Sequence, residues 1–216
     1  MVNQEEILNQ THHYNLNFST REIYLHSYIL GEEESGIEYR MATQFLKNIH
    51  LLDLTNNKNI LIHMQSSGGD WVYGISIYDA IKFCKSSVTI LAHGEVASMS
   101  GIVFQAAKKR VLMPNCEFMV HRGFLMLEGG AATVQSNALW NKKTDKKMLE
   151  ILANRCVNGS YFKEKNMKVA QIEKFIDQKI KKFGDWNLDA EEALAYGFCD
   201  GIFGEKGFET IEKIRK

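Results

Sequence analysis

The sequence of 216 residues predicts an α/β fold in which stacked βαβ units form one domain. Apolar runs of strand length alternate with amphipathic segments of helix length, an order that implies a parallel sheet with right-handed crossovers. The strand runs are continuously apolar, which is typical of strands covered by helices on both faces. The chain has one proline, Pro114, and no Gly/Ser-rich linker, so we expect a single domain over residues 21–216.

The first half of the chain contains the elements that define this order. Residues 1–20 are polar with little periodicity, and we expect them to form a mobile N-terminal arm. Apolar residues recur at helical spacing in residues 38–50 and 71–83, and a further helix-compatible run covers residues 102–107. Strands are expected at residues 22–29, 59–64 and 88–92, and the sheet is extended by residues 110–113 and 118–120.

The second half changes character. A hairpin is expected around Gly129-Gly130, within residues 124–133, and a lysine-rich helix at residues 134–153. A second amphipathic helix is expected at residues 170–182, where one stripe is formed by Ile172, Phe175, Ile176 and Ile180. Two helices and a hairpin so late in a one-domain chain indicate a projection from the body, a feature suited to self-assembly.

Composition excludes several classes of function. Lys and Arg total 26, as do Asp and Glu, so no overall field recruits nucleic acid or an acidic membrane. No window approaches 18 apolar residues and the N-terminus lacks the regions of a signal peptide, so a cytoplasmic protein is expected. The four cysteines are scattered without a Cys-x-x-Cys pair, and they are interpreted as core residues of a reduced protein rather than disulfides or zinc ligands.

The segment 94–101 carries the strongest chemical signal. The β-rich run 88–93 leads to Gly94, and a group of small residues then surrounds Ser98 before the next helix-compatible run. A serine at the turn between a buried strand and a helix N-terminus is where a nucleophile is commonly built, because the first helical N–H groups favour developing negative charge. The same position also suits a helix N-cap, which is the commoner role for serine.

Two further residues would complete a catalytic set with Ser98. His121 ends the segment 116–121 and would supply the base. Asp185 precedes the helix expected near Asp189 and would orient the imidazole and stabilise its charged form. The structural alternatives are a histidine that only packs and an aspartate that caps or is solvated. Ser100 is a rival nucleophile by composition, but it lies two residues further into the helix and is expected to pack or cap.

Gly68-Gly69 follows the strand that ends at Gln65. Tandem glycines at a strand end let the backbone approach a ligand closely and leave an N–H group free to donate. The N–H of Gly69 would then pair with the N–H of Met99 as an oxyanion hole. The alternative is that the two glycines simply turn the chain.

Taken together, in this order and spacing, these residues resemble the proteolytic subunit of the Clp protease and its relatives. The resemblance covers about residues 21–203. The matching positions are Ser67-Gly68-Gly69, Gly74, Ser76-Ile77-Tyr78-Asp79, Gly94, Ala97-Ser98-Met99, Leu112, Pro114-Asn115, Met119, His121, Asp185, Ala190, Glu192-Ala193, Tyr196-Gly197 and Asp200.

The resemblance implies the fold shared by Clp proteases and crotonases and a serine endopeptidase that hydrolyses peptide bonds in polypeptides. The family's serine, histidine and aspartate fall on Ser98, His121 and Asp185, and its oxyanion donors fall on the backbones of Gly69 and Met99. Residues 124–182 correspond to the family's projecting strand–helix handle, through which two heptameric rings of identical subunits stack. Near Gly129-Gly130 a strand would pair with extended substrate.

No metal or organic cofactor is implied for the chain itself. Any ATP would be used by a partner AAA+ Clp unfoldase, because the sequence contains no Gly-x-x-x-x-Gly-Lys-[Ser/Thr] phosphate loop. Phe83 matches one aromatic residue of the family's unfoldase-docking pocket, but other positions of that pocket carry Leu61, His63 and Val111. The family's axial-gate segment is not recognisable in residues 1–20.

Other departures from the family lie near the expected site. Ser67 replaces the usual proline, Ser100 replaces the usual glycine, and Asp70-Trp71 replaces a small aliphatic pair. Three alternatives therefore stay open. One is an unfoldase-independent maturation protease of the phage-head type, and a second is a non-catalytic ring subunit. Crotonase-type acyl-CoA enzymes share the fold but have no need of this serine, histidine and aspartate.

Overall fold

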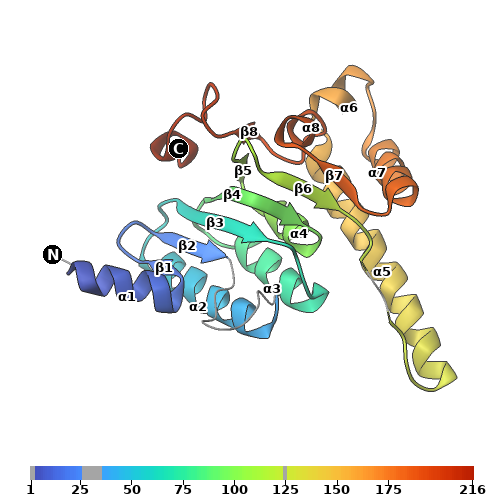
Figure 1. The fold of residues 1–216 in the computed structure, drawn as a ribbon, viewed down its shortest axis with the longest axis horizontal. Coiled ribbons are helices and arrows are strands. Elements are labelled where there is room, and N and C mark those ends of the chain that lie inside the picture. The colour runs from blue at the N-terminus through green and yellow to red at the C-terminus, as the bar shows by residue number, and fades with distance from the viewer. Residues whose placement is uncertain (1–2, 26–35, 124–125) are drawn as a thin grey trace.

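The computed structural model describes residues 3–25, 36–123 and 126–216. Within these ranges eight strands form one sheet in the order β1-β2-β3-β4-β5-β8, with β6 paired to β4 and β7 paired to β6. The strands are β1 (Leu16–Asn17), β2 (Glu22–Leu25), β3 (Ile60–Ser66), β4 (Val88–Ala97), β5 (Lys109–Leu112), β6 (Glu117–Val120), β7 (Trp186–Leu188) and β8 (Gly201–Ile202). Pairing is parallel except for β1–β2 and β6–β7, which confirms the predicted α/β class (Figure 1).

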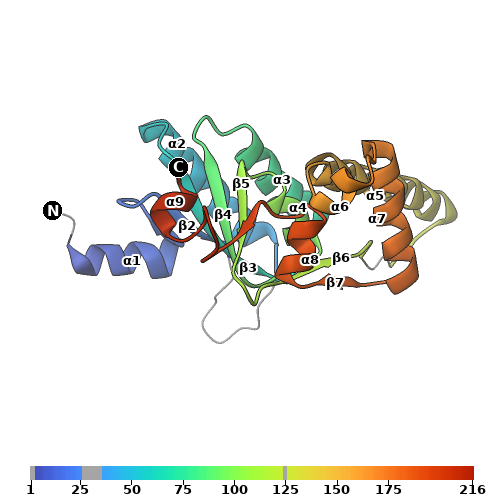
Figure 2. The same ribbon diagram turned by 90° about the horizontal axis from the view of Figure 1, so that it is seen from above.

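Helices cover this sheet and extend beyond it. They are α1 (Gln4–Tyr14), α2 (Tyr39–Thr55), α3 (Trp71–Lys82), α4 (Met99–Phe104), α5 (Ala131–Cys156), α6 (Ser160–Glu164), α7 (Val169–Phe183), α8 (Ala190–Ala195) and α9 (Ile211–Ile214). Helices α2 and α3 pack against each other beside the sheet, and α5 to α8 gather at the end of the molecule away from the N-terminus (Figures 1 and 2). Among the described residues, no helix combines the length and the apolar character needed to cross a membrane.

Strand β4 organises the sheet because it has different partners along its length on one edge. Its first half pairs with β5 from Thr89 to Ala92, and its second half pairs with β6 from Glu95 to Ala97. The sequence predicts only residues 88–92 of this strand, because polar and glycine residues follow the apolar run. The second half ends immediately before Ser98 and lies beside the strand that leads to His121, so it helps to position two of the residues predicted to be catalytic.

Helix α5 forms the core of the projecting region. Its buried residues all lie between Met148 and Cys156, so the N-terminal half of the 26-residue helix has no buried side chain. Figure 1 shows this half extending away from the sheet. The C-terminal half packs against α7, whose buried stripe consists of Ile172, Ile176 and Ile180. The predicted projection is therefore present, with one end anchored by apolar side chains.

The N-terminal segment contains secondary structure that was not predicted from the sequence. Residues 4–14 form helix α1, and Leu16–Asn17 already belong to the sheet through antiparallel pairing with β2. Periodicity gives no signal here because α1 has no buried residue. Its ends are instead set by an Asn3 cap and by Asn15 in the left-handed conformation, with two glutamates in the first turn. These capping signals were available in the sequence.

The observed bounds of other elements differ from the predicted ones. The predicted strand at 22–29 is observed as Glu22–Leu25, and residues 26–29 lie outside the described ranges. The helix expected at 102–107 begins earlier and spans Met99–Phe104. The hairpin and substrate-pairing strand expected near Gly129-Gly130 are not seen, since the described residues 126–130 form no strand. Strand β6 pairs with β4 on one edge and on the other with β7, which follows α7 in the chain.

A buried ion pair fixes the position of β5 relative to the C-terminal region. Arg110 is only 3% exposed, and its guanidinium and backbone N–H both bind the carboxylate of Asp200. The same guanidinium also donates to the carbonyls of Gly197 and Phe198 and to the side chain of Gln105. Such a fully partnered arrangement compensates the cost of removing the charges from water.

Candidate active site

Ser98 lies at the junction between β4 and α4, in a backbone conformation that serine rarely adopts. Its φ is 55° and its ψ is −124°, and its side chain makes no cap hydrogen bond to α4. A positive φ in a non-glycine residue stores strain and is a common feature of nucleophile positions at strand–helix turns. The observed geometry therefore argues against the N-cap alternative and leaves the hydroxyl free for other partners.

Small residues make this turn possible. A Cβ added to Gly68 would lie 2.6 Å from the Cβ of Ser98 and 2.9 Å from the backbone nitrogen of Met99, so only glycine fits there. Ser100 is fully buried, and its hydroxyl lies 2.7 Å from the carbonyl oxygens of both Ser66 and Ala97. Ser100 therefore packs as expected, and this departure from the family pattern ties the end of β3 to the turn.

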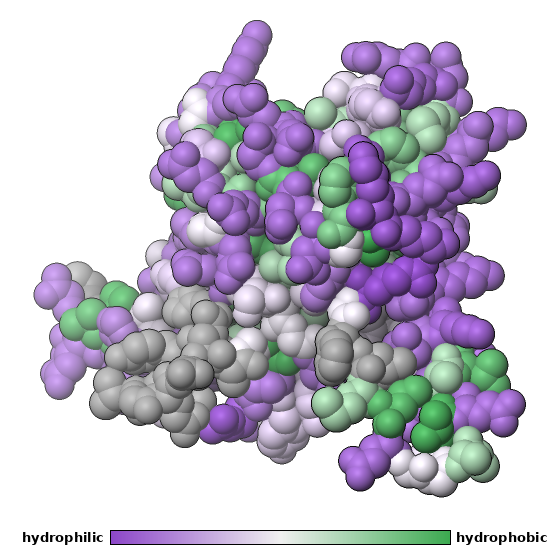
Figure 3. Space-filling model, turned by 45° about the vertical axis from the view of Figure 1, so that its right-hand side comes forward, coloured by the Kyte–Doolittle hydropathy of each residue, from purple (hydrophilic) through white to green (hydrophobic). Residues whose placement is uncertain are grey.

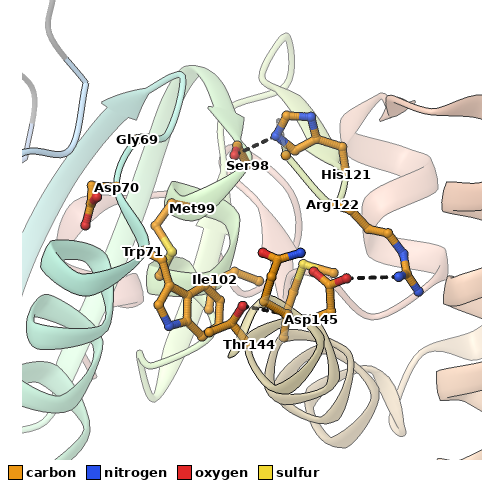
Figure 4. A pocket seen from close by; sticks show the side chains of 13 residues that line it. Gly69, Asp70, Trp71, Ser98, Met99, Ile102, His121, Arg122, Thr144 and Asp145 are labelled. Carbon is orange, nitrogen blue, oxygen red and sulfur yellow. Dashed lines mark hydrogen bonds and ion pairs between the residues drawn. The ribbon is translucent and has the colours of Figure 1, made fainter. Parts of the chain in front are cut away.

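The structure brings Ser98, His121 and Asp185 together in one hydrogen-bonded chain. Nε2 of His121 is 2.7 Å from Oγ of Ser98 (Figure 4). Nδ1 of the same ring is 2.9 Å from Oδ1 of Asp185. Because the carboxylate can only accept, Nδ1 carries the proton and Nε2 accepts from the serine hydroxyl. The Asp185 side chain is 65% exposed and does not cap α8, a role taken by Asp189.

Strand pairing explains why residues 64 positions apart meet. Strand β7 is antiparallel to β6, and its register places Val120 opposite Trp186. One step beyond this pair, His121 and Asp185 continue the same register, so their side chains emerge side by side. In the other direction, Ala97 lies opposite Met119, and the Ser98 N–H donates to the Met119 carbonyl over 3.0 Å. The ladder thus holds all three residues close together.

Two backbone N–H groups near Ser98 have no acceptor among the described residues. Within the described part of the chain, neither the N–H of Gly69 nor that of Met99 donates a hydrogen bond. Gly69 is fixed by its neighbours, since Ile37 accepts from Asp70 and donates to Gly68 on either side of it. Asp70 also caps α3 by accepting from Val72 and Tyr73, which accounts for its place after the glycines.

A cavity of about 460 Å³ opens beside the serine and histidine. Figure 4 shows it between the Ser98 turn and helix α5. Its apolar lining consists of Trp71, Met99, Ile102 and Met148. Its polar lining includes Arg122 and three residues of α5, namely Asn141, Thr144 and Asp145.

The α5 residues of this cavity were not predicted from the sequence. They belong to the helix assigned to the projection, and nothing in their local pattern shows that one of its faces returns to the site. The three most buried cysteines, Cys116, Cys156 and Cys199, lie in the core as predicted, and all four are free. In the described ranges, no group of three or more His, Cys, Asp or Glu is placed to hold a metal ion.

Comparison with known proteins gives a consistent result. The sequence model of the family described as Clp protease matches residues 19–206. A protein of Carsonella ruddii (strain PV) described as "ATP-dependent Clp protease proteolytic subunit" is 31% identical over 173 residues, covering 79% of this chain and 81% of the relative. A protein of Streptococcus mutans with the same description is 33% identical over 77% of this chain and 80% of the relative. A third, from Leuconostoc citreum, is 29% identical over 83% of this chain and 85% of the relative.

Proposed function

The chain belongs to the Clp protease family, and we propose that it is a serine endopeptidase acting through Ser98, His121 and Asp185. The observation that carries this proposal is the hydrogen-bonded chain from Ser98 Oγ through the imidazole to Asp185, at 2.7 and 2.9 Å, beside a cavity. A non-catalytic ring subunit would have no need of this geometry, nor of a strained serine.

In the proposed reaction, Ser98 Oγ attacks the peptide carbonyl while His121 Nε2 takes the hydroxyl proton. Asp185 holds Nδ1–H and stabilises the resulting imidazolium. The tetrahedral intermediate collapses with cleavage of the C–N bond, and Nε2 gives its proton to the leaving amine. Water then attacks the acyl-enzyme with His121 again as base, which releases the acid and restores the serine. No metal or organic cofactor enters these steps.

The free N–H groups of Gly69 and Met99 are proposed to bind the oxyanion. Their lack of any acceptor within the described structure supports this role, because a donor aimed at a ligand site needs no reorganisation when charge develops. Met99 is also the first residue of α4, where the helix dipole adds positive potential. Each such donor is typically worth about 3–4 kcal/mol of transition-state stabilisation.

Substitution of Gly69 by alanine tests this assignment. An added Cβ would lie 2.3 Å from the carbonyl oxygen of Ile37, and the residue's φ of +144° disfavours any side chain. The backbone must shift, which displaces the N–H, so kcat for peptide cleavage is expected to fall by about 10²- to 10³-fold. Steady-state kinetics with an internally quenched peptide would measure the loss.

Gly204→Ala is the matched control for this variant. Gly204 has a φ of +95° but no atom within 4 Å of an added Cβ, so it carries the conformational cost without the clash. Activity should be retained in Gly204→Ala. Equal losses of kcat in the two variants would contradict the oxyanion role of Gly69.

We further propose that the chain assembles into stacked heptameric rings through residues 124–182. The N-terminal half of α5 supports this, because it has no buried residue and carries apolar side chains, including Trp140 at 62% exposure. Figure 3 shows apolar side chains gathered at the free end of this helix. A second copy of the chain would cover this surface.

The dependence on an ATP-driven partner is proposed from the relatives, whose descriptions call them subunits of an ATP-dependent protease. One observation favours the second candidate, an unfoldase-independent maturation protease. Of the positions compared with the docking pocket, only Phe83 presents apolar surface, at 81% exposure. Leu61 and Val111 are buried beneath Ile214 of α9, and the ring of His63 stacks on Tyr24.

One fractionation experiment tests the proposal as a whole. The purified protein is separated by size-exclusion chromatography with light scattering, and each fraction is assayed with a quenched peptide and with a folded protein plus a Clp unfoldase and ATP. Peptide cleavage that elutes with an assembled species supports the serine endopeptidase ring. Cleavage of the folded protein in the presence of the unfoldase and ATP would favour the ATP-dependent Clp protease. Cleavage of the peptide alone would favour the unfoldase-independent maturation protease. Absence of peptide cleavage in every fraction would contradict both.

A further inference from the structure

Arg122, the residue after His121, contacts two helices of the projecting region. Its guanidinium donates to Oδ2 of Asp145 in α5 over 2.9 Å, and it forms a second ion pair with Asp177 in α7. Asp177 also accepts from Lys181, one turn further along α7, at 2.7 Å. Figure 4 shows Arg122 extending from the strand end toward Asp145. One side chain beside the proposed base is therefore fastened to both helices.

The main chain just after His121 lies beyond the sheet, so its position depends on other contacts. The β6–β7 ladder ends at the pair Val120–Trp186, so His121 lies just beyond it. Among the described residues 121–123, no hydrogen bond between backbone groups takes over from the ladder. Gly123 follows with a φ of +76°, a conformation open to few other residues. The ladder therefore holds the chain on the N-terminal side of His121. On the C-terminal side, the described contacts that hold the chain are those of the Arg122 side chain.

The partner of Arg122 on α7 is close in sequence to the proposed third member of the triad. Helix α7 ends at Phe183, and Asp185 follows after Gly184. The Arg122–Asp177 ion pair therefore joins the segment that carries His121 to the helix that delivers Asp185. This ion pair and the His121–Asp185 hydrogen bond connect the same two segments.

The charges of this cluster depend on each other. Burial raises the pKa of Asp145, although Arg122 acts in the opposite direction. Burial would also raise the pKa of Asp177, but hydrogen bonds from Lys181 and Arg122 outweigh it and hold that pKa below its usual value. Removing Arg122 leaves Asp145, at 15% exposure, as an unpaired carboxylate beside the cavity. Such a group drives local rearrangement because its desolvation is no longer compensated.

From this geometry we infer that Arg122 is a positioning residue, which keeps His121 Nε2 within hydrogen-bond reach of Ser98 by tying its segment to α5 and α7. The inference rests on the proposed serine endopeptidase function of the same site. It concerns alignment rather than contact with substrate, so its loss should slow the chemical step and leave binding nearly unchanged. Misplacement of a catalytic group by about 1 Å can cost on the order of 10²-fold in rate.

The test is the kinetics of Ser98 modification by a fluorophosphonate probe in the full-length assembled protein. In Arg122→Gln we expect the maximal inactivation rate, kinact, to fall by about 10- to 100-fold, with little change in the probe's KI. Arg122→Lys should recover part of kinact, because an ammonium can pair with one of the two carboxylates. The matched control is Lys146→Gln, which removes a positive charge from an exposed ion pair with Glu150 on α5 and should label like the wild type.

Two milder variants keep the inference testable if Arg122→Gln does not fold. Asp177→Asn breaks the tie to the helix that delivers Asp185, and Asp145→Asn breaks only the tie to α5. The inference predicts the larger fall in kinact for Asp177→Asn. A raised KI with unchanged kinact in Arg122→Gln or Asp145→Asn would instead show a contact with the bound molecule and would overturn it. Wild-type kinact in Arg122→Gln would overturn the inference alone, whereas an unlabelled wild type would overturn the proposed function as well.

Discussion

Replacement of Ser98 by alanine is expected to lower kcat for peptide hydrolysis by about 10⁴- to 10⁶-fold. The substitution removes the only atom that can form the acyl-enzyme in the proposed reaction, and what remains is the contribution of the oxyanion donors and of substrate binding. Fold and assembly should be preserved, because the Ser98 hydroxyl bonds to His121 and does not cap α4. The measurement is residual cleavage of a quenched peptide by the assembled variant.

Ser100→Ala is the control, since Ser100 is the rival serine of the same turn. Its hydroxyl is buried against two carbonyls, so the expected cost is one of stability, about 1 kcal/mol, with the nucleophile intact. The account is contradicted if Ser98→Ala retains activity within tenfold of the wild type, or if Ser100→Ala alone abolishes it.

The second large effect is expected on stability. Asp200→Ala leaves the buried guanidinium of Arg110 without its carboxylate partner, and breaking a buried pair in this way typically costs about 3–5 kcal/mol. We expect the lower end, because the Asp200 side chain is 35% exposed and water can reach the vacated position. A loss of about 3 kcal/mol corresponds to a fall in Tm of roughly 6–12 °C for a domain of this size.

Thermal unfolding of the variant measures this effect. The matched control is Glu209→Ala, which breaks an exposed ion pair to Lys213 one turn away and should leave Tm nearly unchanged. A Tm for Asp200→Ala equal to that of the control would show that carbonyls and Gln105 suffice to stabilise Arg110. That result would contradict the structural role assigned to the pair.

The strand–helix order of the body was predictable from local sequence, because continuous apolar runs and helical stripes are local signals. The second half of β4 was not, since Gly94 and Glu95 interrupt the apolar run, and the strand continues to Ala97 through pairing of Glu95–Ala97 with β6 and of Val96 with Ser66 of β3. Strand β7 has just three residues, and its existence depends on an antiparallel partner, β6, that lies 66 to 70 positions earlier in the chain. No local pattern reports such a contact.

The residues of the candidate site were predictable to different degrees. Ser98, His121 and Asp185 were identified through composition, order and resemblance, and the structure explains their meeting by the register of β6 and β7. Arg122 has an ordinary sequence context, and its importance appears only when α5 and α7 are placed around it. Its partners Asp145 and Asp177 are charged residues on helices, and nothing in the local sequence distinguishes them from charged residues that face solvent.

The most direct test of the central claim is to identify the residue that a fluorophosphonate modifies. The assembled wild-type protein is treated with the probe, digested and mapped by mass spectrometry, with His121→Ala treated in parallel. We predict a single phosphonyl adduct on Ser98 in the wild type and a much slower reaction in His121→Ala. An adduct on Ser100 or on another serine, or no adduct on the assembled protein, would contradict the assignment of Ser98 as the nucleophile.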